Sequence, residues 1–203
     1  MPRLPRHAAG LRIGLLGGSF NPPHEGHRMI SLHALRRLQL DRVWWLVTPG
    51  NPLKETGGLP SSFERARAAR ALAHHPRIDV TTLEDDIDKK FTAETLQWLV
   101  RRCPGVRFVW MMGADNLQGF HRWHKWQEIA QMMPIAVFDR QGATLAASRA
   151  RSAIALGRFR VPEGRAGRLS GMAAPAWVFF HGKRSPLSST QLRAKLPDPA
   201  RSR

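Results

Sequence analysis

The chain has 203 residues, a formal net charge of +17 and a single cysteine. Its length suits one domain with a sizeable core, and hydrophobic and charged contents of 42% and 23% exclude a disordered chain. The lone Cys103 excludes an intrachain disulfide and a cysteine-based metal site, which favours a reducing, cytoplasmic location. We expect no signal peptide and no membrane segment, because no run of about 18 apolar residues occurs.

The positive charge is carried mainly by arginine. Only six of the 32 basic residues are lysines, and the arginines are spread along the chain, most densely between residues 140 and 168. No zinc-finger spacing, RNA-binding aromatic pattern or basic heptad accompanies them. A basic nucleic-acid-binding protein is therefore kept only as an alternative of another class. Anionic small-molecule substrates would be attracted by the same field. The composition leaves open whether the chain forms a homo-oligomer.

Short apolar runs alternate with helical patterns along the chain. The patterns predict, in order, a strand over 12–17, a helix over 25–40, a strand over 43–48, a helix over 61–74, a strand over 77–83, a helix over 92–103, and strands over 106–113, 134–139 and 176–181. Apolar strands separated by helices predict an α/β fold with a Rossmann-like parallel sheet, flanking helices and a small helical C-terminal portion. We expect one domain over residues 11–196, with flexible basic tails at 1–10 and 197–203.

The stretch GLLGGSFNPPHEGH, residues 14–27, ends the first apolar run. The loop after the first strand is the usual phosphate site of such a sheet. Gly17 and Gly18 let the backbone approach a phosphate closely, and a helix that starts near Glu25 directs N–H groups and its positive dipole end at the same place. The spacing excludes a dinucleotide fingerprint, a Walker loop and the zinc-protease motif.

His24 and His27 lie three residues apart on the first turn of the expected helix, so they share one face beside the phosphate loop. Imidazoles suit phosphoryl or nucleotidyl transfer because they donate hydrogen bonds to the charge that builds on phosphate oxygens. We therefore predict that both are catalytic groups acting on a triphosphate. We do not expect them to be metal ligands, and no protein metal site is predicted.

The stretch GGSFNPPHEGH resembles the signature of nucleotidyltransferases with a His-x-Gly-His motif, and its Phe-Asn-Pro-Pro-His form resembles the nicotinate-nucleotide adenylyltransferases. The resemblance implies adenylyl transfer from ATP with Mg²⁺ to nicotinate mononucleotide in NAD biosynthesis, without a covalent intermediate. Nicotinamide mononucleotide or another phosphorylated small molecule is the alternative acceptor. The resemblance also implies ATP binding by Gly17, Gly18, Ser19 and Phe20.

A second phosphate clamp is predicted near the end of the chain, where SPLSSTQLRAKL resembles the family's Ile-Ser-Ser-Thr-x-x-Arg motif. Ser188, Ser189 and Thr190 fit the N-cap and first turn of a short helix, which would direct hydroxyl and N–H groups at an anion. Arg193 lies about one turn further along and would add charge-assisted bonds. We predict that these four residues hold the ATP phosphates.

Further motifs resemble the family's acceptor site. They are TPGNPLKE after the second strand, FTAETL at a helix start, MGADNLQGFHRWHKWQEI after the fourth strand and VFDRQG after the fifth. The resemblance implies that a helix start holds the nicotinate carboxylate and that a tryptophan stacks on the pyridine ring. By this resemblance the acceptor is bound by Asn21, Lys54, Thr92, Asp115, Trp123, His124 and Arg140.

Overall fold

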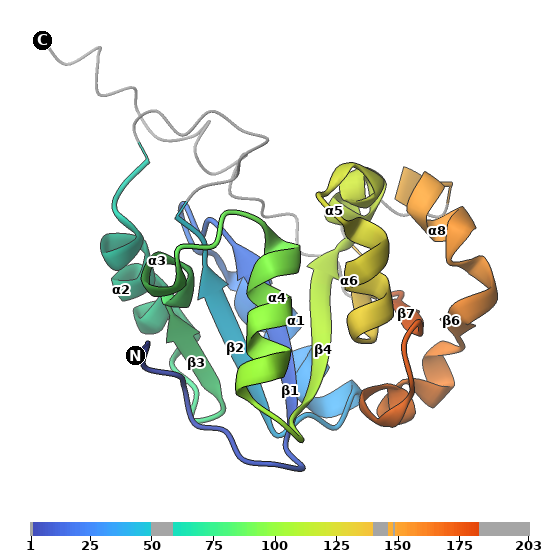
Figure 1. Ribbon diagram of the computed structural model, residues 1–203, viewed down its shortest axis with the longest axis horizontal. Coiled ribbons are helices and arrows are strands. Elements are labelled where there is room, and N and C mark those ends of the chain that lie inside the picture. The colour runs from blue at the N-terminus through green and yellow to red at the C-terminus, as the bar shows by residue number, and fades with distance from the viewer. Residues whose placement is uncertain (1, 50–58, 140–145, 148, 183–203) are drawn as a thin grey trace, which may run out of the picture.

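In the computed structural model a seven-stranded, wholly parallel sheet lies between helices on both faces (Figure 1). The structure describes residues 2–49, 59–139, 146, 147 and 149–182. The strands are β1 (Arg12–Gly18), β2 (Arg42–Val47), β3 (Ile78–Thr81), β4 (Arg107–Gly113), β5 (Ile135–Phe138), β6 (Arg160–Val161) and β7 (Trp177–Phe180). Their spatial order is β3-β2-β1-β4-β5-β7-β6. The predicted Rossmann-like α/β fold is confirmed.

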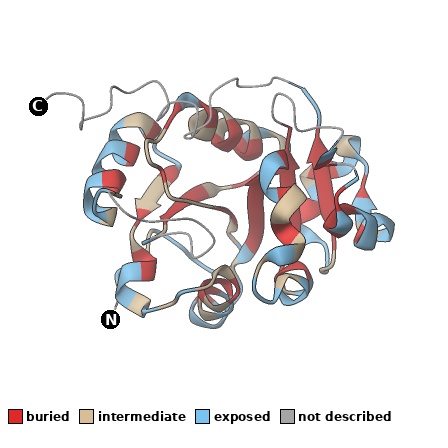
Figure 2. Ribbon diagram, turned by 90° about the horizontal axis from the view of Figure 1, so that it is seen from above, coloured by how far each residue is buried: buried red, intermediate tan, exposed pale blue. Residues whose placement is uncertain are grey.

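The helices bury two separate cores, one on each face of the sheet. They are α1 (Glu25–Arg37), α2 (Ser62–Ala73), α3 (Leu83–Ile87), α4 (Thr92–Arg102), α5 (Ala114–Gly119), α6 (Trp126–Met132) and α8 (Arg151–Ala155), with 3-10 turns η1 (Phe120–Arg122), η2 (Gly157–Phe159) and η3 (Glu163–Gly171). Buried residues of α1, α2 and η3 share one core, and those of α3, α4, α5, α6 and α8 share the other. Figure 2 shows buried strands between helices whose outer sides are exposed.

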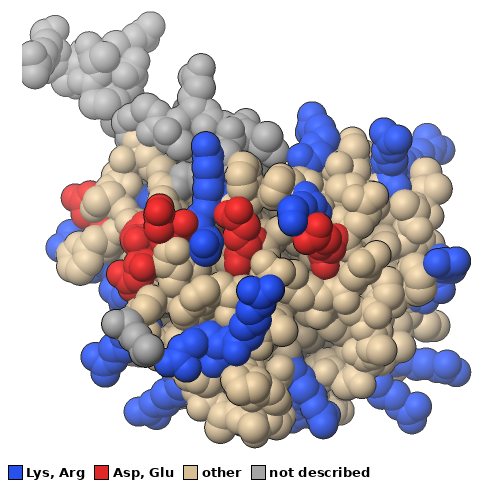
Figure 3. Space-filling model, in the orientation of Figure 1, with Lys and Arg blue, Asp and Glu red and all other residues tan. Residues whose placement is uncertain are grey.

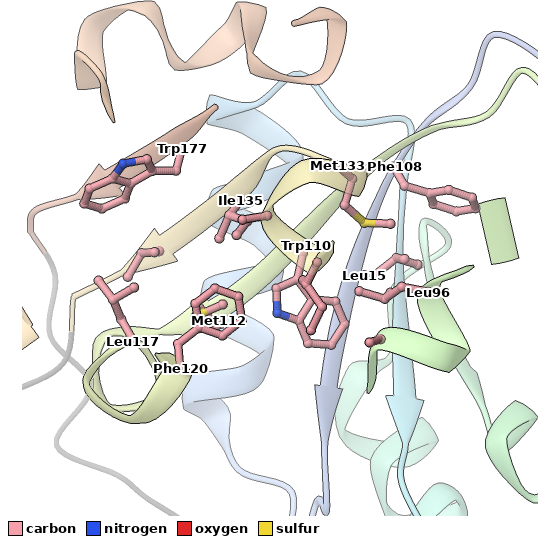
Figure 4. Packing of buried hydrophobic residues seen from close by; sticks show 14 of the residues in the cluster. Leu15, Leu96, Phe108, Trp110, Met112, Leu117, Phe120, Met133, Ile135 and Trp177 are labelled. Carbon is pink, nitrogen blue, oxygen red and sulfur yellow. The ribbon is translucent and has the colours of Figure 1, made fainter. Parts of the chain in front are cut away.

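Alternation along each strand decides which core a side chain enters. Trp44 and Trp45 are neighbours in β2 and both are fully buried, yet they belong to opposite cores. Figure 4 shows the core on the α4 side, where Trp110 of β4 lies among Leu15, Leu96 and Met112. Burial on both faces explains why the strands are continuously apolar in sequence.

Several element boundaries differ from the sequence patterns. The helix expected over 25–40 ends at Arg37, and Gln39 adopts a left-handed conformation with φ +53°. The strand expected over 77–83 is shorter, because Leu83 already begins α3. The expected helix over 61–74 is confirmed, including the reciprocal cap between Ser61 and Glu64. The helical portion expected at 185–196 lies outside the described residues.

The segment before β1 contacts the rest of the fold. Leu4 packs against the core on the α4 side, and the Gly10 N–H donates to the Gly105 carbonyl at 2.8 Å. The predicted domain limits and tails stay a prediction. Within the described residues, no helix combines the length and the apolar character that crossing a bilayer requires.

A buried carboxyl group joins α3 to α4. Glu84 is only 8% exposed, and its Oε1 accepts a hydrogen bond from Thr95 Oγ1 at 3.0 Å. Burial raises the pKa of Glu84 from an ordinary value of 4.5 to about 7. The folded protein therefore keeps a proton that the unfolded chain loses between these two values. The contribution of Glu84 to stability is fully present below pH 4.5 and is lost as the pH rises to about 7.

We predict that Glu84→Gln stabilises the protein at pH 8, because the amide keeps an acceptor for Thr95 and cannot ionise. The gain in the free energy of unfolding should reach about 3 kcal/mol at pH 8 and largely disappear at acidic pH. Urea unfolding curves across this pH range measure it. Asp86→Asn, the same change at an exposed position of α3, is the matched control. A gain that is equal at all pH values would contradict the prediction.

Candidate active site

The loop that follows β1 lies where the order of the sheet reverses. The chain goes from β1 through α1 to β2 on one side, while β4 pairs with the other side of β1. Ligands of open α/β sheets bind in the crevice at the carboxyl ends of the strands beside such a reversal. Ser19 and Asn21 are half-buried residues of this loop. The loop and the start of α1 therefore occupy the place that the fold favours for a ligand.

Gly17 has a packing reason to be glycine. A Cβ atom there would lie 2.6 Å from Cη2 of Trp110, whose ring leans toward the end of β1. Gly18 is different, because a Cβ on it would meet only ordinary contacts with the Phe20 ring, from 3.5 Å. The expected role of both glycines in phosphate binding stays a prediction.

The two histidines cap the helix that carries them. His24 is the N-cap of α1, and its Nδ1 accepts the Gly26 N–H at 3.1 Å. His27 Nδ1 accepts the His24 N–H at 3.2 Å, and the two ring centroids are 3.9 Å apart. A neutral imidazole that accepts at Nδ1 carries its proton on Nε2. Both rings therefore carry their proton on Nε2, and in His24 this atom is buried.

Phe20 packs against the His27 ring. Its side chain is 1% exposed, with the ring centroid 4.7 Å from that of His27 and stacked on Trp45 at 5.1 Å. Phe20 adopts a left-handed backbone conformation with φ +47°, which is uncommon for a bulky residue. Because the ring is enclosed, the predicted ATP contact of this residue would come from its backbone.

Arg65 of α2 is a positioning residue that sequence reasoning missed. Its guanidinium is buried and donates to the carbonyl oxygens of Ser19, of Thr48 at 2.8 Å and of Pro49 at 3.2 Å. Burial lowers its pKa from the ordinary value. It thus ties the loop after β1 to the loop after β2. The spacing could have revealed it, since Arg65 falls in register with Ala69 and Ala73 on the inner face of the helix.

On the other face of the sheet, the start of α4 meets the segment after η1. The Phe91 ring, at the N-cap of α4, stacks on the His124 ring with centroids 4.4 Å apart. Thr92, the first residue of α4, directly follows Phe91 in the chain, and the expected roles of Thr92 and His124 stay predictions. Trp123 packs edge-on against Phe120, with ring centroids 5.4 Å apart, and against Trp110 at 6.3 Å.

The remaining expected residues divide into two sets. Asp115 is exposed in the first turn of α5, directly after β4. The others lie outside the described residues, and these are Lys54, Arg140, Ser188, Ser189, Thr190 and Arg193. In the part of the chain that is described, no three His, Cys, Asp or Glu side chains gather in a way that could hold a metal ion.

Comparison with known proteins adds independent information. The sequence profile of the cytidylyltransferase-like family matches residues 15–195. A probable nicotinate-nucleotide adenylyltransferase of Bradyrhizobium sp. (strain BTAi1 / ATCC BAA-1182) is 60% identical over 183 residues, which are 90% of this chain and 95% of that protein. Another from Methylorubrum extorquens is 58% identical over 185 residues, which are 91% of this chain and 100% of that protein.

The fold has a counterpart among solved structures. The Plasmodium falciparum nicotinic acid mononucleotide adenylyltransferase complexed with NaAD matches with a TM-score of 0.69 over 91% of this chain and 83% of that chain. At 15% identity this likeness concerns the fold alone. The family profile and the two bacterial relatives concern the sequence over nearly its whole length. Together with the histidine-capped helix after β1, they show that this chain belongs to the cytidylyltransferase-like family, within its group of nicotinate-nucleotide adenylyltransferases.

Proposed function

We propose that the chain transfers the adenylyl group of ATP to nicotinate mononucleotide, giving nicotinate adenine dinucleotide and pyrophosphate in NAD biosynthesis. A phosphate oxygen of the mononucleotide attacks the α-phosphorus of ATP, and the bond from that phosphorus to the β-phosphate oxygen breaks. The observation that carries the proposal is the pair of imidazoles that cap α1 at the reversal of the sheet. The close relatives with this name support the choice of reaction.

His24 and His27 would stabilise the charge that moves onto the phosphates. Each Nδ1 is held by a backbone N–H, so each Nε2–H is oriented before the substrate binds. The positive end of the α1 dipole lies at the same place and would add to this stabilisation. Donors oriented in advance need no reorganisation during the reaction, which is the main source of catalysis in phosphoryl transfer.

Mg²⁺ fits this scheme as an ion that arrives with ATP. Magnesium is commonly held by substrate phosphates, several waters and one or two carboxylates. The described residues hold no larger cluster of ligands, and Asp115 is an exposed carboxylate beside the end of β4. Bound Mg²⁺ would neutralise charge on the triphosphate, and the proposal needs no cage made entirely of protein groups.

The acceptor would lie on the α4 side of the sheet. N–H groups in the first turn of α4 and around His124, together with the Thr92 hydroxyl, offer donors to the nicotinate carboxylate. Trp123 offers an aromatic surface to the pyridine ring. Asn21, Lys54, Asp115 and Arg140 complete the proposed acceptor site, and Ser188, Ser189, Thr190 and Arg193 the proposed second clamp on ATP. We further expect the reaction to take place in the cytoplasm.

A pyrophosphate-release assay tests the proposal directly. The purified full chain is given ATP, Mg²⁺ and each of several mononucleotide acceptors, and the dinucleotide product is identified by mass spectrometry. Formation of nicotinate adenine dinucleotide is the expected result. Product from another phosphorylated acceptor, with none from nicotinate mononucleotide, would overturn the assignment.

We predict that His27→Ala raises the free energy of the transition state by about 2 to 4 kcal/mol, because a preorganised donor is lost. Steady-state pyrophosphate release measures the effect as a loss in kcat/KM. His33→Ala is the matched control, since His33 lies on the same helix and contacts only the Phe138 and Phe180 rings among the described aromatic residues. Equal activities of the two variants would contradict a catalytic role for His27.

We predict that Trp123→Ala raises the KM for nicotinate mononucleotide and spares the KM for ATP. Stacking on an aromatic ring contributes about 1 kcal/mol beyond burial, and that contribution is lost with the indole. Trp126→Ala is the control, because Trp126 packs against the same Phe120 ring, at 5.7 Å. If both variants changed the two KM values alike, Trp123 would be acting only through packing.

We predict a strong preference for nicotinate over nicotinamide mononucleotide. The site proposed around Thr92 and His124 offers donors, which suit a carboxylate and leave the NH₂ of an amide facing other donors. Each buried group left without a partner costs about 1 to 3 kcal/mol. The ratio of kcat/KM for the two mononucleotides measures this preference. A ratio near one would show that the carboxylate is not the feature recognised.

A further inference from the structure

We infer that Trp45 and Ser31 are positioning residues for His27, an inference that rests on the proposed adenylyl transfer. They form a buried link from the middle of the sheet to the first turn of α1. Neither side chain is among the predicted ligand contacts, and both are fully buried. Their role would be to fix where the His27 imidazole stands.

Two hydrogen bonds in series make the link. Trp45 Nε1–H donates to Ser31 Oγ at 2.7 Å, and the Ser31 hydroxyl donates to the His27 carbonyl oxygen at 2.8 Å. Ser31 stands four residues after His27, which is the spacing that lets a helical serine reach the carbonyl of the preceding turn. The hydroxyl uses its single proton on His27, so its oxygen is free to accept from the indole.

Ring contacts connect the same residues by a second route. The Trp45 ring stacks on Phe20 at 15° between the ring planes, and its centroid is 5.9 Å from that of His27. Phe20 in turn contacts the His27 ring at 4.7 Å. The rings of Phe20 and Trp45 therefore pack against the His27 imidazole, and the hydrogen-bonded link holds the backbone carbonyl of His27.

The first turn of a helix needs such support more than the rest. Its N–H groups lack partners within the helix, and helix ends open locally at little cost in free energy. Trp45 is a firm anchor because it lies within β2, between Leu16 of β1 and Val80 of β3. An error of about 1 Å in the position of a catalytic group can reduce the rate about a hundredfold.

The neighbouring tryptophan provides a matched control. Trp44 is also fully buried in β2, but it faces the α4 side, where its ring contacts Phe108 at 5.8 Å. Its Nε1 has no hydrogen-bond partner among the described residues. Trp44→Phe and Trp45→Phe remove the same atoms from adjacent positions. Only Trp45→Phe breaks the link to α1, and it keeps an aromatic ring near Phe20.

The experiment compares the two variants with the parent full chain. We expect Trp45→Phe to lower kcat by about tenfold to a hundredfold with little change in the KM for ATP. Trp44→Phe should keep a kcat close to that of the parent. Thermal unfolding of both variants shows whether their losses of stability are similar. In ¹H–¹⁵N spectra, the ring nitrogen signals of His27 should shift in Trp45→Phe and stay in place in Trp44→Phe.

Ser31→Ala is the second variant, because it removes one oxygen and breaks the same link should Trp45→Phe not fold. If both residues act through one chain of bonds, the double variant should lose little more activity than the worse single variant. Equal kcat values for Trp45→Phe and Trp44→Phe, or additive losses in the double variant, would overturn the inference. An inactive parent chain would instead overturn the proposed function, and unshifted His27 signals in Trp45→Phe and Ser31→Ala would still refute the positioning role.

Discussion

Two hydrogen bonds at the start of α1 set the tautomer of both imidazoles in the proposed active site. A backbone N–H occupies Nδ1 of His24 and another occupies Nδ1 of His27. Helix caps are usually built from Ser, Thr, Asp or Asn, which satisfy the free N–H groups and leave nothing behind for catalysis. An imidazole cap accepts an N–H with one ring nitrogen and still carries a proton on the other. The same bonds that cap the helix therefore leave the proton of each ring on Nε2, where the proposed reaction would use it.

The residues of the proposed site lie on both faces of the sheet. The histidine pair, Phe20 and Trp45 belong to the face covered by α1, whereas Thr92 and Trp123 belong to the face covered by α4. Gly17 lies in β1, between the two faces of the sheet. Because it has no side chain, the Trp110 ring can pack against its backbone. In the proposed reaction, the donor nucleotide and the acceptor would approach the same loop from opposite sides of the strand, which would suit a direct transfer between two bound substrates.

Long buried segments could be predicted from the sequence, and short or isolated features could not. Continuous apolar runs such as VWWLVT predict a parallel sheet because each must be buried on both faces. Strand β6 has only two residues and α3 only five, and these lengths are too short to show a periodic pattern in the sequence. Arg65 was missed because an arginine in a helix is normally exposed. The bond between Trp45 and Ser31 joins residues 14 positions apart and depends on register that no local pattern contains.

Charged groups are arranged differently at the amino ends and at the carboxyl ends of the strands. At the amino ends of the strands, Arg12 and Arg42 form two-pronged ion pairs with Asp41 and Asp79, and the bond to Arg12 lowers the pKa of Asp41. On the face drawn in Figure 3, the acidic side chains lie in a row with basic side chains both between and around them.

The carboxyl ends of the strands receive positive potential from another source. Helices α1 and α5 begin there, directly after the loop that follows β1 and directly after β4, so the positive ends of their dipoles lie at the carboxyl ends of the strands. Arg65 adds a buried cation at this edge, and its donors are directed to carbonyl oxygens. These hydrogen bonds go to neutral acceptors, and the charge of Asp85 also acts on the guanidinium. In the proposed reaction it would therefore both hold these backbone segments and favour a nearby polyanion such as a triphosphate.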